Sequence, residues 1–431
     1  MSVITAQQNV TVIRTSFRAP IIYAVIALAV LLGLALPISA HASTTFTFAR
    51  PTDLVTVPSW TAPSRTLAIV LSLVALALAA ASAWAAATTR KLGAWVPIVF
   101  GVAVVAVLLT WAGAGKTATS MQITGLLTAA LVASIPLVFG ALSGTICERS
   151  GIINIAIEGQ LLGGAFLAAV VAGAVANSTG SRSLGAYLGL VAAPVAGALI
   201  GAVLSLFAVR YWVDQIIVGV VLNVLVVGLT NFLFGTLLKD KTYLNQAIGL
   251  PELPIPILGE IPIIGPVLFR QNALVYLMYV VVIVLQVMLF RSRWGLRVRA
   301  VGEHPRAADT VGIKVNRTRV RNTILGGAIA GLGGAFFTVA AGLAFGKEMS
   351  AGKGFIALAA MILGRWSPKG ALAAAVLFGF ADALREQFGI VGTAIPSQFL
   401  AMFPYIATIF AVAGLVGHSR PPAAEGKPYA K

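Results

Sequence analysis

The sequence has very few of the residues that build disulfides and metal sites. Among its 431 residues there is one cysteine, Cys147, and there are three histidines. A single cysteine excludes an intrachain disulfide and a cysteine-rich metal site. The histidines (His41, His304 and His418) are far apart and fall at expected loops or ends, so we predict no metal site and no cofactor.

Charge is also scarce. Only 10% of the residues are charged, whereas globular domains have about 25%. With 59% hydrophobic residues and a mean hydropathy of +0.96, the composition predicts an integral membrane protein. A net charge of +17 could suggest nucleic acid. The largest cationic cluster, however, is a loop between apolar segments, which favours contact with membrane lipid and no nucleic-acid partner.

Apolar runs long enough to cross a bilayer as helices recur along the chain. We therefore expect an all-α polytopic membrane protein with about 10–12 transmembrane helices. The expected spans are about 20–40, 66–87, 93–112, 122–146, 161–177, 185–208, 215–237, 272–290, 322–344, 371–387 and 397–417. The run at 355–364 is too short to cross alone, and residues 238–271 are expected to form an external, proline-broken lid.

The most charged interruption is the loop at residues 291–321, with nine Lys and Arg residues against two acids. Basic loops between spans lie on the cytoplasmic side, which also places both termini in the cytoplasm. Within this loop, Pro305 suits the first position of a short helix and Gly312 suits its left-handed end. Such a helix either docks onto a cytoplasmic partner or folds back on the lipid surface.

Polar residues within the expected spans are candidates for a solute path, because burying them in lipid is unfavourable. Asn154 and Glu158 share one helix face, and the preceding residues 149–151 predict a broken helix. Each side chain could also simply be satisfied by a neighbouring helix. The candidates for a path are Asn154, Glu158, Asn223, Asn231, Phe380 and Asp382.

One stretch resembles the phosphate-binding loop of a nucleotide site. Residues 113–117 read GAGKT, but a phosphate-binding loop needs a glycine where Thr110 stands and a strand before it. We therefore expect no nucleotide site and no catalytic residues in this chain. If transport uses ATP, a separate chain hydrolyses it.

Three motifs carry a family resemblance: ERSGIINIAIEGQLLGGAF (148–166), RAVGEHPRAADTVGI (299–313) and GKGFIALAAMILGRWSPKGALAAAVLFGFADAL (352–384). They resemble permease subunits of bacterial ABC importers, in the branch that holds ribose and branched-chain amino-acid permeases. Within that branch they are most similar to the nucleoside and simple-sugar permeases. The resemblance covers roughly residues 120–417.

The resemblance implies a bacterial cytoplasmic-membrane protein with three parts: extra N-terminal helices (1–115), a permease core (116–417) and a cytoplasmic tail (418–431). It also implies that the loop helix is a coupling helix that inserts into an ATP-binding subunit. Further implied partners are a second permease subunit, an extracytoplasmic solute-binding protein and a small polar solute. The implied docking residues are Gly302, Glu303, Pro305, Ala307, Ala308 and Gly312.

The resemblance favours a nucleoside as the solute, since amides and a carboxylate can bind ribose hydroxyls. Phe336, Phe337, Phe378 or Phe380 could stack on a base, or they could be core packing. A pentose or another sugar is an alternative for the same machinery. A stand-alone secondary carrier is an alternative of a different class.

Overall fold

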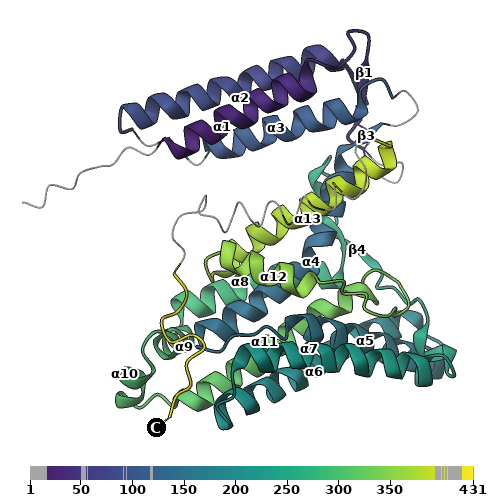
Figure 1. Cartoon of the computed structure of the whole chain (residues 1–431). Coiled ribbons are helices and arrows are strands. Elements are labelled where there is room, and N and C mark those ends of the chain that lie inside the picture. The colour runs from purple at the N-terminus through teal and green to yellow at the C-terminus, as the bar shows by residue number, and fades with distance from the viewer. Residues whose placement is uncertain are drawn as a thin grey trace, which may run out of the picture. The chain divides into compact units, whose positions relative to one another are not determined.

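The computed structural model describes residues 17–49, 55, 57–90, 92–93, 95–116, 120–393, 399, 402, 405 and 420–430. The expected span at about 397–417 lies almost wholly outside the described residues. The chain divides into an N-terminal unit (residues 1–52, 56–123 and 388–394) and a core unit (residues 53–55, 124–387 and 395–431). Each unit is described by itself (Figure 1).

The N-terminal unit contains three helices and a small sheet. Its helices are α1 (Arg18–Val30), which continues as the π-helical turn η1 (Leu31–Ala35), α2 (Ser64–Ala87) and α3 (Trp95–Gly113). The sheet has the strand order β2-β1-β3, formed by β1 (Ser43–Thr47), β2 (Trp60–Pro63) and β3 (Met121–Gln122). No strands were expected from the sequence, which predicted an all-α protein.

The core unit is built from helices, ten of which are α-helices in the described part of the chain. They are α4 (Ile123–Arg149), α5 (Ile157–Thr179), α6 (Arg182–Ser205), α7 (Gln215–Leu233), α8 (Ala273–Arg291), α9 (Arg293–Glu303), α10 (Pro305–Thr310), α11 (Val315–Gly334), α12 (Lys353–Leu363) and α13 (Pro368–Val391). Eight helices of the described chain, three of them N-terminal, are long and apolar enough to cross a membrane. The expected all-α polytopic class is confirmed.

Several core helices begin at a polar residue that caps them. The side chain of Ser181 accepts a hydrogen bond from the backbone N–H of Leu184 at the start of α6. Asp214 does the same at α7, Asn272 at α8 and Ser292 at α9. Such caps satisfy N–H groups that have no partner within the helix. They explain why isolated polar residues stand directly before apolar runs.

Helices α5, α6 and α11 pack at unusually close range because glycines face one another. A Cβ at Gly197 of α6 would overlap the carbonyl oxygen of Gly327 in α11. A Cβ at Gly164 of α5 would likewise overlap the carbonyl of Gly331. Small residues allow this backbone approach, and dispersion contacts then hold the helices together. The three helices therefore form a closely packed group within the core unit.

The expected span at 322–344 was wrong in its position. Helix α11 begins seven residues earlier, at Val315, and after Gly334 only a 3₁₀ turn, η7 (Ala335–Phe337), continues it. The charged residues at 315–321 suggested a loop, yet they form the first turns of the helix. Residues 338–352 are consequently an irregular segment leading into the short helix α12, which was expected.

The segment between α7 and α8 contains the turns expected of a proline-broken lid. It includes the π-helical turn η3 (Phe234–Leu238), the 3₁₀ turns η4 (Thr242–Asn245) and η5 (Leu258–Glu260), and η6 (Gly265–Phe269). Strands β4 (Glu252–Pro254) and β5 (Arg270–Asn272) pair antiparallel and close the segment on itself.

Candidate functional site

The break between α4 and α5 is held by buried amides. Asn154 is fully buried in the non-helical residues 150–156, and its side-chain nitrogen donates to Ser143 Oγ and Gln160 Oε1, both at 3.0 Å. Asn223 of α7 accepts from the N–H of Gly159 at 2.8 Å and donates to the carbonyl of Ile155 at 2.9 Å. Asn223 therefore satisfies backbone groups beside the break, whereas Asn154 ties the break to side chains of α4 and α5.

Glu158, in the first turn of α5, fixes a second irregular segment. Its Oε1 accepts from Ser350 Oγ at 2.6 Å and from the N–H of Gly352 at 2.8 Å, while Oε2 accepts from the N–H of Gly354 at 2.6 Å. Glu158 is 7% exposed, so these donors replace its water. The carboxylate thus joins the break of α4–α5 to the start of α12.

Two further polar contacts extend this arrangement to α7 and α13. Lys353 Nζ lies 3.1 Å from Asp382 Oδ2 on α13, and both side chains are partly exposed. Asn231 of α7 donates to Glu348 Oε1 at 3.2 Å. Its Oδ1 is buried and has no hydrogen-bond partner among the described residues. We call the set Asn231, Glu348, Glu158, Lys353 and Asp382 the polar line.

Four of the six predicted path residues therefore belong to or adjoin one arrangement. Glu158, Asn231 and Asp382 lie in the polar line, and Asn223 supports the break beside it. Asn154 is instead fully enclosed by its partners. Phe380 is half-buried on α13, two residues before Asp382.

The aromatic residues considered for base stacking differ in how deeply they are buried. Phe337 and Phe378 are buried, so they pack in the core. Phe336 is half-buried and lies at 73° to the ring of Phe337. The sequence analysis missed Phe345, which makes an edge contact with Phe166 at 5.2 Å, three residues before Glu348.

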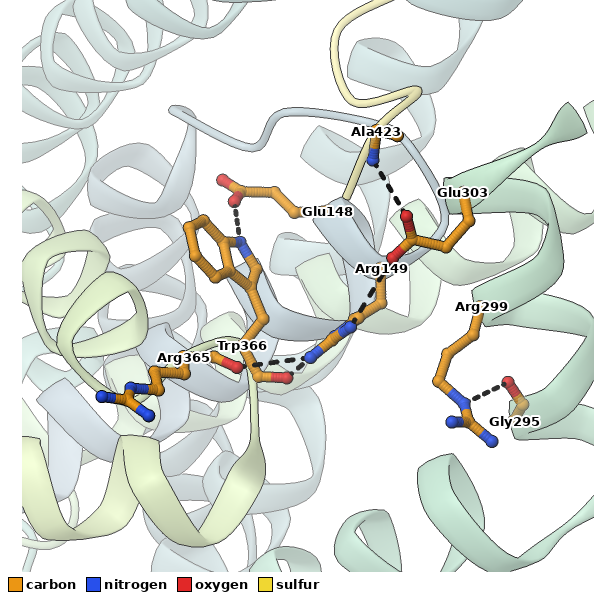
Figure 2. A network of polar contacts seen from close by, with 8 residues as sticks. All are labelled: Glu148, Arg149, Gly295, Arg299, Glu303, Arg365, Trp366 and Ala423. Carbon is orange, nitrogen blue, oxygen red and sulfur yellow. Dashed lines mark hydrogen bonds and ion pairs between the residues drawn. The ribbon is translucent and has the colours of Figure 1, made fainter. Parts of the chain in front are cut away.

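The quoted motifs meet at the C-terminal end of α4, just before the break, in a set of contacts that we call the motif node (Figure 2). Arg149 donates through Nε to the carbonyl of Trp366 at 3.0 Å and through Nη2 to that of Arg365 at 3.3 Å. The indole N–H of Trp366 donates to the Glu148 carboxylate. Arg149 also pairs with Glu303 at 4.0 Å. The second and third motifs are thus both packed against the first.

The loop helix forms as predicted. α10 begins at Pro305, and Gly312 has a left-handed φ of +83°. The preceding helix, α9, was missed because its basic residues suggested an irregular loop. Gly302 of α9 is buried, and a Cβ there would overlap the carbonyl of Arg149.

Only part of the predicted docking set faces outward. Glu303, Ala307 and Gly312 are exposed, and Pro305 is half-exposed. Ala308 is 3% exposed and packs with Val301 and Val315 in a small cluster. Ala308 therefore holds α10 against α9 and α11 instead of contributing to the exposed face.

A segment at residues 420–430, which we call the strap, lies against the motif node. The N–H groups of Ala423 and Ala424 donate to Glu303 Oε2 and to the carbonyl of Gly302, at 3.2 and 2.9 Å. The buried Arg319 donates to the carbonyl of Lys427 at 2.7 Å. The Glu425 side chain is hydrogen-bonded to Glu148, and burial raises the pKa of Glu425. The sequence analysis found no signal for these contacts, since they join distant segments.

The comparisons with known proteins identify the family of the chain. The family model described as "Branched-chain amino acid transport system / permease component" matches residues 126–413. The chain belongs to this family. The guanosine ABC transporter permease protein NupQ of Bacillus subtilis is 38% identical over 70% of this chain and 95% of its own length. No solved structure matches the chain significantly.

Two other relatives show the range of solutes in this family. The nucleoside ABC transporter permease protein NupC of Lactococcus lactis is 37% identical, over 70% of this chain and 95% of its own length. A putative glucose ABC transporter permease protein of Haloferax volcanii is 33% identical, over 66% of this chain and 89% of its own length. The chain is therefore a multi-pass membrane permease of the ABC class, and the resemblance noted from its motifs is confirmed.

Proposed function

We propose that this permease belongs to an ATP-driven importer whose solute is a nucleoside. Two relatives named for guanosine and nucleoside transport, at 38% and 37% identity, support this solute. The chemistry of the polar line supports it as well, because carboxylates, an amide and an ammonium group suit hydroxyls and ring nitrogens.

The observation that carries a transport function is the direct contact between the broken helix and the α9–α10 loop. Gly302 packs against the carbonyl of Arg149, and Glu303 pairs with the same residue. A displacement of α10 therefore moves residues 149–156. Glu158 lies directly after them in the sequence, so it moves too, together with residues 350–354, to which it is hydrogen-bonded. Close packing transmits such a shift because packed interfaces change between discrete arrangements.

The free oxygen of Asn231 is the atom best suited to contact the solute. A buried acceptor without a partner is unfavourable by about 1–3 kcal/mol. A hydroxyl of a bound sugar would satisfy it, while Lys353 and Asp382 offer a donor and an acceptor near by in the same polar line. Binding then recovers free energy that the empty protein lacks.

The same proposal assigns partners and orientation. The exposed face of α10, with Ala307 at its centre, contacts a separate ABC ATP-binding subunit that hydrolyses ATP. A second permease subunit completes the path, and an extracytoplasmic solute-binding protein delivers the solute. The basic loop at residues 291–321 and both termini then lie in the cytoplasm.

Uptake of labelled guanosine and uridine tests the solute. We expect uptake in cells that have the gene and none in cells that lack it, with competition by unlabelled nucleosides but not by ribose. Competition by ribose or glucose alone would instead assign the permease to sugars, as for the Haloferax relative.

Ala307→Glu tests the coupling role, with Ala307→Ser as the matched control. The bulky carboxylate should abolish uptake, because α10 would no longer fit its partner, whereas the hydroxyl should be tolerated. Membrane levels of both variants are measured in parallel. Normal uptake by correctly inserted Ala307→Glu would falsify the coupling assignment.

A further inference from the structure

A cavity of about 560 Å³ lies beside the coupling helix, between α9, the turn after α10 and the first turns of α11. Five cationic side chains line it: Arg293, Arg297, Lys314, Arg317 and Arg321. No carboxylate of the described residues lines it. Its volume is in the range of small-molecule sites, about 300–1,000 Å³.

These cations have no neutralising partner in the described part of the chain. None of the five makes an ion pair or a side-chain hydrogen bond with another described residue. Arg149, in contrast, forms an ion pair with Glu303 and donates hydrogen bonds to the carbonyls of Arg365 and Trp366. Like charges gathered around one cavity repel one another, and the attraction of a bound anion for them offsets this repulsion.

The cavity also has apolar side chains at its exposed margin. Leu296 and Val311 line it and are 62% and 75% exposed. Arg293 follows the last residue of the membrane-spanning helix α8 by only two positions. Leu325, one turn after Arg321 on α11, is also exposed. Cations at the end of a span, next to exposed apolar side chains, match a molecule with an anionic head and a hydrocarbon tail.

We propose that this cavity binds the headgroup of an anionic diacyl phospholipid, such as phosphatidylglycerol, from the adjoining leaflet. Basic pockets at the cytoplasmic ends of spanning helices suit such headgroups. An acidic surface of the ATP-binding subunit would need the same cations but not the exposed Leu296 and Val311. This inference goes beyond the transported solute and does not depend on it.

The test uses the purified full-length permease in detergent and counts bound lipid by native mass spectrometry. Phosphatidylglycerol should bind saturably, and phosphatidylcholine should not at the same concentration. In the variant Arg297→Gln/Arg321→Gln, the affinity for phosphatidylglycerol should fall about 25-fold, since each cation contributes roughly fivefold near an anionic headgroup.

The matched control is Arg291→Gln/Lys369→Gln, which removes the same charge from exposed positions outside the cavity. It should change the affinity less than twofold. An equal loss in the control, equal binding of phosphatidylcholine, or displacement by equimolar inorganic phosphate would overturn the proposal. So would unchanged lipid binding in the cavity variant with loss of ATP-binding subunit on co-purification, which would assign the cavity to that protein.

Thermal unfolding shows whether the double variant is folded. If it is not, the single variants Arg317→Gln and Arg321→Gln replace it, each with an expected fivefold loss. Because lipid is counted on the purified permease, a failure of nucleoside uptake leaves this result unaffected.

Discussion

The two units of the molecule are both made of apolar helices, but the two most deeply enclosed of these helices lie in the core unit. In α4 and α5, 67% and 61% of the most apolar stretch is buried, against 22% and 28% in α1 and α2. The other spans of the core unit, α6 to α8, bury only 33%, and α3 of the N-terminal unit buries 44%. The core unit therefore differs in having two enclosed helices around which polar groups can be buried.

The buried polar residues differ in the same way. In the N-terminal unit they are hydroxyls, such as Thr44, which bonds to Ser64 Oγ at 2.8 Å and to the carbonyl of Thr110 at 2.9 Å. In the core unit they include Glu148, Glu158 and Arg319. The family match begins at residue 126 and so excludes nearly all of the N-terminal unit. Transport chemistry is thus expected in the core unit alone.

The largest effect should come from matched glycine substitutions in the two units. Gly197→Ala should prevent folding of the core unit, because its Cβ alone overlaps the α11 backbone. Gly101→Ala, in α3, should be tolerated or slightly stabilising, since a Cβ there meets no atom within 4 Å. Yield of monodisperse protein in detergent measures both, and similar yields would contradict the contrast in packing.

Glu158→Ala should abolish uptake and lower stability by about 3 kcal/mol, because three buried donors lose their acceptor. Thr44→Val in the N-terminal unit should lower stability by about 1 kcal/mol and leave uptake unchanged. Uptake rates and unfolding midpoints check the pair. Equal loss of uptake in both variants would show that the N-terminal unit takes part in transport.

Asn231→Leu should separate solute binding from stability. It removes an oxygen that has no partner among the described residues and one exposed hydrogen bond, from Nδ2 to Glu348 at 3.2 Å, so stability should fall by no more than about 1 kcal/mol while the KM for uptake rises about tenfold. Thr230→Val is the control, because the Thr230 hydroxyl bonds only to the carbonyls of its own helix. An unchanged KM for Asn231→Leu would remove Asn231 from the solute path.

The smallest expected effect is a weakening of the contact between the strap and the motif node as the pH rises. Burial raises the pKa of Glu425 above the ordinary value of about 4.3, so the docked strap holds a proton more tightly than the released one. Raising the pH from about 5 to about 8 should therefore weaken docking. A spin label at Ala430→Cys should become more mobile over this range, and Glu425→Gln should remove the change. The native Cys147 is buried, which leaves the new thiol to react.

The sequence predicted the structure best where a local pattern is enough to determine a helix or its ends. Run length located most spans to within a few residues, and the pair Pro305 and Gly312 located α10. It failed at α9 and at the start of α11, where basic residues suggested a loop although packing against neighbours makes them helical. The sequence could not predict the contacts of Glu158 with residues 350–354 or those of Arg149 with residues 365–366. They join positions nearly 200 or more apart, and no local pattern encodes which distant donor a carboxylate will meet.

The strap also has a consequence for the biogenesis of the permease. Its contact with the α9–α10 loop joins residues 120 positions apart, Glu303 and Ala423. At a synthesis rate of about 5–20 residues per second, α10 waits roughly ten seconds before the strap can reach it. During that interval Glu303 and the carbonyl of Gly302 lack the N–H donors of the strap. The contacts of the strap are therefore among the last to form, after the helices between the two segments have been synthesised.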